Sequence, residues 1–102
     1  MLYLTSFRTV PGRLVDHLTA QGTARKHLER LGGRVRTVQA IGRAPSTIGT
    51  MIGFDDFEHY GEFGAKFEVD EQWATFWMGL AADPPAEQVE TAVAALLEPP
   101  SA

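Results

Sequence analysis

Apolar and β-branched positions open the chain and stop at a turn signal. Residues 2–10, LYLTSFRTV, end at Pro11-Gly12, and this pattern predicts a β-strand. Both faces of the strand carry apolar residues. We therefore expect both to be covered, one by helices and the other by a second copy of the chain.

A helical period follows over residues 13–31. At about 100° per residue the apolar positions fall on one side, which we expect to face the core: Leu14, Leu18, Ala24, Leu28 and Leu31. Gly32-Gly33 is a typical C-terminal helix stop. Gly22 lies inside the helix, where glycine costs about 1 kcal/mol relative to alanine. Its presence there indicates a close approach to a strand.

Two more strands are predicted, at residues 34–42 and 47–54, joined by a turn at RAPS. In the second of them Gly49 and Gly53 share a face with Met51. Glycines on one face of a strand indicate either that something packs or binds tightly there, or that the strand bulges or twists.

The second half of the chain predicts two consecutive helices. Asp55 or Asp56 is suited to cap the first and Asp70 the second, with a break near Val69. The tail, residues 86–98, fits a helix or a strand equally well by spacing. Alanine and glutamate favour a helix by propensity. The preceding elements have the order β-α-β-β-α, however, and one more strand would complete a split β-α-β arrangement, so we predict a strand. The fold class is then α+β, a ferredoxin-like split β-α-β-β-α-β arrangement with an antiparallel four-stranded sheet.

Three polar residues interrupt the apolar side of the first predicted helix. His17, Gln21 and Arg25 are four residues apart and run obliquely across that side. An arginine beside a histidine can bind a carboxylate or an enolate and supply an acid or base near neutral pH. His17 and Arg25 are thus candidate catalytic residues, and Gln21 is a candidate substrate-binding residue. The alternative is that the Arg25 stem lies along the core edge and His17 is half-exposed.

Ten of the 102 residues are aromatic, and most of them are expected in the core. Trp73 and Trp77 lie on one side of the last predicted helix and are candidates for the wall or lid of a ligand pocket. Tyr3 and Gln39, both on predicted strands, are candidates to orient a ligand. For Tyr3 the alternative is a side chain at a dimer interface.

The remaining histidines do not indicate a metal site. His27 and His59 are interpreted as solvated residues, and the three histidines lack a metal-binding spacing, so we predict no metal. The chain also lacks a nucleophile elbow, a P-loop and a GxGxxG sequence, and we predict no tightly bound cofactor.

Composition narrows the class of protein. A chain of 102 residues fits a single domain, residues 1–102. The formal net charge of −4, with scattered arginines, argues against a nucleic-acid partner. No apolar run is long enough to span a membrane, and the apolar start lacks the basic region of a signal peptide. The absence of cysteine excludes disulfides and thiolate chemistry and fits a reducing compartment, so we expect a cytoplasmic protein.

Three stretches resemble the dimeric α+β barrel superfamily. They are LYLTSFRTVPGRLVDHL, ERLGGRVR and TMIGFDDFEHYGEFGAKFEVDEQWATFW. The last looks like the passage from the third strand to the second helix in antibiotic-biosynthesis monooxygenase-like and NIPSNAP-like proteins, and the chain resembles small uncharacterised bacterial members. The resemblance covers nearly the whole chain and implies a homodimer whose sheets pack face to face. It also implies a pocket between the sheet and the helices of each subunit.

Two hypotheses of function follow. In the first, the protein is a small-molecule enzyme that acts on an aromatic or polyketide-like substrate, as a monooxygenase, cyclase or isomerase. In the second, it is a non-catalytic dimeric ligand-binding or accessory domain. The haem-degrading branch of the superfamily typically uses a helix histidine, but His59 lies opposite Phe57 and Phe67 on its helix, which weakens a haem hypothesis.

Overall fold

The computed structural model describes residues 1–39 and 47–94. Its elements follow in this order: β1 (Leu2–Thr9), α1 (Leu14–Arg30), β2 (Arg34–Gln39), β3 (Thr47–Gly53), α2 (Phe57–Val69), α3 (Glu71–Ala82) and β4 (Ala86–Ala94). The strands form an antiparallel sheet in the order β2-β3-β1-β4. The α+β class and the split β-α-β-β-α-β order are confirmed. The tail is a strand as far as Ala94; the predicted turn and positions 95–98 lie outside the described residues.

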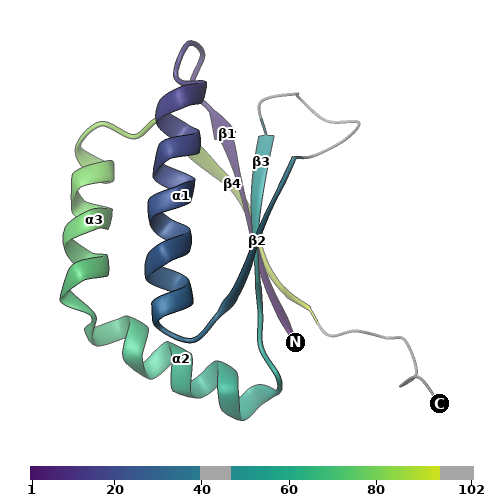
Figure 1. Cartoon of the computed structure of the whole chain (residues 1–102). Helices are drawn as coiled ribbons and strands as arrows, with labels where there is room; N and C mark the ends of the chain where they lie inside the picture. The colour runs from purple at the N-terminus through teal and green to yellow at the C-terminus, as the bar shows by residue number, and fades with distance from the viewer. Residues whose placement is uncertain (40–46, 95–102) are drawn as a thin grey trace.

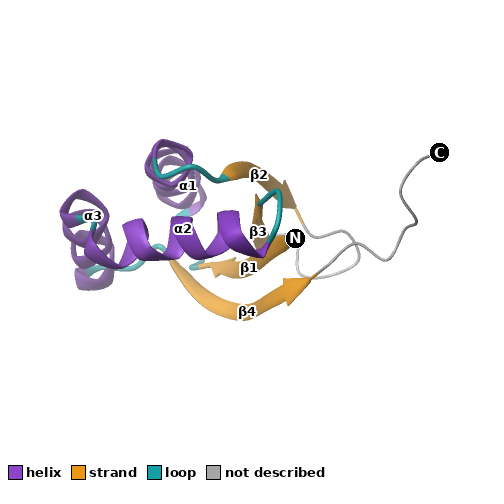
Figure 2. Ribbon diagram, turned by 90° about the horizontal axis from the view of Figure 1, so that it is seen from below, coloured by secondary structure: helices purple, strands orange, loops and turns teal. Residues whose placement is uncertain are grey.

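The three helices lie on one side of the sheet (Figure 1). Seen from below, α1 lies over the β2 side, whereas α3 lies farther out, toward the side of β4 (Figure 2). No described element covers the other face of the sheet. The expectation that helices cover one face is therefore confirmed. The expectation that a second copy of the chain covers the other face stays a prediction.

Strand register fixes which side chains face the helices. The Thr50 hydroxyl donates a hydrogen bond to Gln21 Oε1 of α1, so Thr50 points to the helical side. Thr5 pairs with Thr50, and Tyr3 and Phe7 lie two positions away on either side of Thr5, so all three share that side.

The core lies between the C-terminal half of α1, the helix α2 and the sheet. It consists of Leu28, Leu31, Val35, Ile52, Phe54 and Phe63, with Met1, Tyr3, Tyr60, Phe67 and Trp73 packed against it. Gly33 makes this packing possible, since a Cβ there would lie 2.6 Å from Ile52 Cγ2 and 3.4 Å from Phe63 Cε2. The close approach of helix and strand therefore occurs at Gly33, just after α1.

Two expectations about α1 are wrong. Gly22 is exposed, and no described heavy atom outside its own helix turn lies within 4 Å of the place a Cβ would take. Leu14 and Leu18 do not face the core, because each remains 50% exposed. The line of α1 that meets the sheet instead contains His17, Gln21 and Leu28, the buried residues of this helix.

Side-chain caps set the two later helices. Asp56 begins α2 by accepting a hydrogen bond from the His59 amide, and Asp70 begins α3 by accepting one from the Trp73 amide. The predicted break near Val69 is confirmed, because α2 ends at that residue.

Candidate functional site

His17 and Gln21 belong to a buried row of polar side chains that joins α1 to two strands. His17 Nδ1 lies 2.7 Å from Thr9 Oγ1 of β1, and His17 Nε2 lies 3.2 Å from Gln21 Nε2. Thr50 of β3 completes the row by donating to Gln21 Oε1 at 2.6 Å. We call Thr9, His17, Gln21 and Thr50 the interior relay.

The relay determines the protonation state of His17. Gln21 Oε1 accepts from Thr50, so its amide nitrogen donates to His17 Nε2, which must accept. The ring is then neutral, and its hydrogen lies on Nδ1, which donates to Thr9. Burial also lowers the pKa of His17, because the charged ring would lose its hydration. His17 is 2% exposed, not half-exposed, and both of its nitrogens are engaged.

Arg25 is separate from this row. Its Nε lies 2.6 Å from Glu29 Oε1, and both side chains are about half-exposed. It lines an open depression of about 460 Å³ along the outer edge of β2, together with Val35, Arg36, Thr37 and Val38. The structure therefore brings His17 and Gln21 together and places Arg25 elsewhere. The catalytic roles suggested for His17 and Arg25 stay predictions.

Trp73 lies on the inward side of α3, and Trp77 lies one helical turn farther on, beside it. Trp73 packs against the core and stacks with Trp77, with ring centroids 6.0 Å apart and planes at 18°. All twelve residues of α3 are described and none is buried, and Trp77 remains 46% exposed. Tyr3 packs against the same core cluster as Trp73. Gln39 is exposed on β2, which lies at the opposite edge of the sheet from β4.

Two ion pairs fasten the ends of α3 to the ends of α1. Arg30 binds Asp70 with two hydrogen bonds of 2.9 and 2.8 Å, and Arg13 binds the Asp83 carboxylate at 2.8 Å. The Arg30 guanidinium and the Trp73 amide stabilise the charged Asp70 and lower its pKa to about 2. α3 is thus held at its ends although it buries no residue.

His27 contributes to this attachment, which the sequence analysis did not anticipate. Its Nδ1 accepts a hydrogen bond from Arg30 Nη2 at 3.1 Å, and its ring lies 5.5 Å from that of Phe76 and 6.2 Å from that of Trp73. Its place on the flank of α1 near Arg30 was predictable from spacing. Its contacts with Trp73 and Phe76 were not predictable from spacing, because these residues lie more than forty positions farther along the chain.

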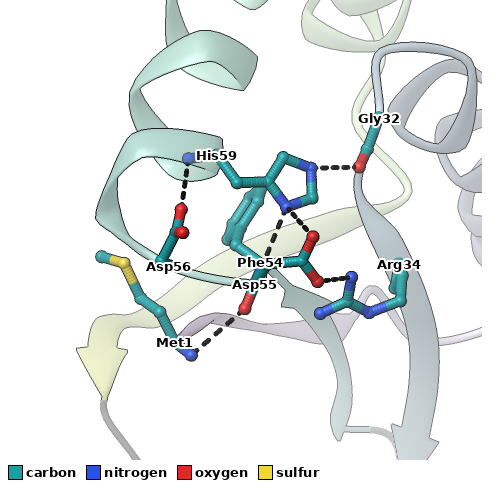
Figure 3. A network of polar contacts seen from close by, with 7 residues as sticks. All are labelled: Met1, Gly32, Arg34, Phe54, Asp55, Asp56 and His59. Carbon is teal, nitrogen blue, oxygen red and sulfur yellow. Dashed lines mark hydrogen bonds and ion pairs between the residues drawn. The ribbon is translucent and has the colours of Figure 1, made fainter.

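His59 clamps the start of α2 to the turn after α1 (Figure 3). Its Nδ1 accepts from the Asp55 amide at 3.0 Å, and its Nε2 donates to the Gly32 carbonyl at 2.8 Å. Arg34 binds Asp55 at 2.7 Å in the same network. Both ring nitrogens of His59 are thus used within the protein. Within residues 1–39 and 47–94, no group of three acidic or histidine side chains is arranged to hold a metal ion.

A second polar row, exposed to solvent, lies on the helical side of β1 and β4. Thr5 Oγ1 is 3.4 Å from Thr91 Oγ1, and Gln88 Nε2 donates a hydrogen bond to Thr91 Oγ1. The sequence analysis missed this row because its members are common surface residues. Only the strand register brings them together.

Comparison with solved structures places this architecture among known ones. An uncharacterised NIPSNAP domain protein from Burkholderia xenovorans is similar over 96% of this chain and 97% of its own, with a TM-score of 0.68 and 17% identity. A NIPSNAP family protein from Agrobacterium tumefaciens is similar over 98% and 97%, with a TM-score of 0.66 and 16% identity. The chain shares the fold of the NIPSNAP-domain proteins.

The NIPSNAP-type fold extends to a further named group. A candidate antibiotic biosynthesis monooxygenase from Bordetella bronchiseptica is similar over 93% of this chain and 96% of its own, with a TM-score of 0.61 and 17% identity. The resemblance noted in the sequence is therefore confirmed for the fold. No protein-family model matches the chain, and no curated protein matches it in sequence. No helix within the described residues has the length and apolar character needed to cross a membrane.

Proposed function

We propose that the protein is a cytoplasmic homodimer that binds a small aromatic or polyketide-like molecule between α3 and the β1–β4 side of the sheet. The observation that carries the proposal is the state of α3. It is fastened by ion pairs at both ends, yet Trp77, which stacks with the core-packed Trp73, is 46% exposed. An exposed aromatic side chain beside a core-packed one offers a stacking surface for a planar ligand.

Support for the homodimer comes from the face of the sheet that no described element covers. Strand register places Leu4, Met51 and Val38 on it, and Val38 is 42% exposed. Gly49 lies among them, and a Cβ there would lie 3.1 Å from Val38 Cγ2. These closely spaced apolar side chains, with Arg36 beside Met51 and Arg8 on the same face, suit a second sheet packed face to face.

The geometry favours a binding role over catalysis by His17. Its two nitrogens are occupied by Thr9 and Gln21, and the ring is buried. An acid–base role requires one of these partners to release it when substrate binds. The second candidate, a cofactor-independent enzyme, draws support from the Bordetella structure, whose name describes an oxygenase.

Tryptophan fluorescence titrations with naphthalene-type and quinone ligands test the binding proposal. We expect binding by the wild type, a large loss of affinity in Trp77→Ala, and little change in Met78→Ala, because Met78 is 73% exposed on a neighbouring side of α3. Equal affinity in all three proteins, or no binding by any ligand, refutes the proposal. Product analysis of the bound ligands under oxygen, with His17→Phe as control, decides between binding alone and turnover.

Light scattering after gel filtration tests the dimer. Met51→Glu places a charge in the proposed interface and should yield monomers, whereas Val15→Glu, on the 77% exposed outer side of α1, should leave the dimer intact. A wild-type monomer at micromolar concentration contradicts this part of the proposal.

A further inference from the structure

We propose that Thr5, Gln88 and Thr91 form the polar half of the ligand site and select an uncharged hydrogen-bonding group over a carboxylate. This inference rests on the proposed function and specifies the chemistry of its ligand. It also replaces the anion-holding role that the sequence suggested for Arg25, because Arg25 lies at the other edge of the sheet.

Strand register places this row on the helical side of the sheet. Thr5 pairs with Thr50, whose hydroxyl reaches α1, and Thr91 pairs with Thr5 across the next ladder. Gln88 pairs with Phe7, whose ring meets that of His17 edge-on at 6.3 Å. All three polar side chains therefore point to the helical side.

The row is accessible to solvent although it lies on the helical side of the sheet, with Thr5 half-buried. β1 is a central strand, and the corresponding hydroxyl on β3, that of Thr50, is buried under α1. The Thr5–Thr91 contact is open to solvent, and Thr91 and Gln88 are exposed. α1 lies over the β2 side of the sheet, whereas α3 lies farther out, toward the side of β4 (Figure 2). In the proposed site the ligand would lie between this row and α3.

The chemistry of the row suits a neutral group. A threonine hydroxyl both donates and accepts, and a glutamine carboxamide does the same with separate atoms. Such groups can satisfy a carbonyl, a hydroxyl or an amide on a ligand. A carboxylate moved out of water needs a cation or several strong donors to offset the lost hydration.

No lysine or arginine among the described residues is available to this row. Arg13 and Arg30 are engaged by Asp83 and Asp70. Strand alternation puts Arg8 on the opposite face of the sheet. The other described lysines and arginines belong to β2, to the α1 surface or to α2: Arg25, Lys26, Arg34, Arg36 and Lys66.

Two ligands of equal shape test the inference. 2-Naphthamide and 2-naphthoate differ in charge and little else, and their affinities can be measured by tryptophan fluorescence and calorimetry at pH 7.5. We expect the amide to bind about tenfold or more tightly than the carboxylate. Thr91→Val and Thr5→Val should each weaken amide binding about three- to tenfold, since each removes one hydrogen-bonding group.

Thr37→Val is the matched control. Thr37 is an exposed threonine on the helical side of β2, at the other edge of the same sheet, and its replacement should leave both affinities unchanged. Circular dichroism and melting curves verify that each variant is folded.

The possible failures are distinguishable. If neither naphthalene ligand nor any other aromatic compound binds, the proposed function fails and this inference fails with it. If the ligands bind but the carboxylate equals the amide, or if folded Thr91→Val and Thr5→Val behave like Thr37→Val, ligand binding stands and the polar row is refuted as its selector.

Discussion

The interior relay makes a quantitative prediction about stability. Gln21→Leu keeps the volume of the side chain but leaves His17 Nε2 without its donor and the Thr50 hydroxyl without its acceptor. Each buried polar group left unpaired costs about 1–3 kcal/mol, so we expect the free energy of unfolding to fall by about 2–4 kcal/mol. The expected loss of stability is smaller than the largest sum of the two penalties, because the leucine side chain makes new apolar contacts.

A double-mutant cycle separates hydrogen bonding from packing. Thr50→Val alone removes the donor to Gln21 Oε1 and should also destabilise the protein. In the double variant Gln21→Leu/Thr50→Val both partners are apolar, so its cost should be at least about 1 kcal/mol less than the sum of the single variants. Thr23→Val, which removes an exposed hydroxyl on the same helix, should change stability by about 0.5 kcal/mol or less.

The assay is urea unfolding followed by circular dichroism at one fixed protein concentration, since association would shift the apparent stability. Additive single variants that each cost no more than Thr23→Val would refute the relay as a buried, mutually dependent network.

The relay also predicts a pH dependence. The unfolded chain binds a proton at His17 with an ordinary pKa near 6.5, whereas burial lowers the pKa of His17 in the folded protein. The unfolded state therefore binds more protons below about pH 6.5, and the free energy of unfolding falls as the pH decreases, by at most about 1.4 kcal/mol per pH unit. His17→Phe removes this contribution. An unchanged slope between pH 7.5 and 5.5 in that variant would contradict the assignment.

Four further variants test other contacts. Gly33→Ala should destabilise the fold by about 1–3 kcal/mol because its Cβ would enter the core, whereas Gly22→Ala should stabilise α1 by about 0.4–1 kcal/mol, and melting curves compare the two. Asp70→Ala should lower the melting temperature and expose α3 to hydrogen exchange, and protection of α3 equal to that in the wild type would contradict this expectation. Because the pKa of Asp70 is lowered from 3.8 to about 2, acid below about pH 4 should progressively weaken the same attachment in the wild type. His59→Phe should speed amide exchange at Asp55, and an unchanged rate there would show that the clamp is dispensable.

The fold was predictable because its signals are local. Proline and glycine pairs mark the ends of β1 and α1, and aspartates mark the starts of α2 and α3. The tail was ambiguous by spacing, and the order of the other elements decided correctly for a strand. That decision depended on sheet topology rather than on residue propensity, which favoured a helix.

The site was less predictable because its partners are not local. His17 and Gln21 were correctly grouped by helical spacing, but their hydrogen-bond partners, Thr9 and Thr50, come from two strands that only the folded sheet brings under α1. Arg25 satisfied the same spacing rule and yet lies apart, since 40° of drift per four residues carries it toward β2.

The contrast between the two polar rows explains where a ligand can act. Both rows lie on the helical side of one sheet and both contain threonines. The interior relay is buried under α1, whereas the row of Thr5, Gln88 and Thr91 is accessible to solvent. α1 is held to the sheet by buried side chains, whereas α3 is held by arginine–aspartate pairs at its two ends. Ion pairs at the ends fix the position of a helix without burying its side chains, and α3 buries none. The two aspartates that fasten α3 thus leave Trp77 available for a ligand, and so we expect the exposed row, rather than the histidine, to decide what the protein binds.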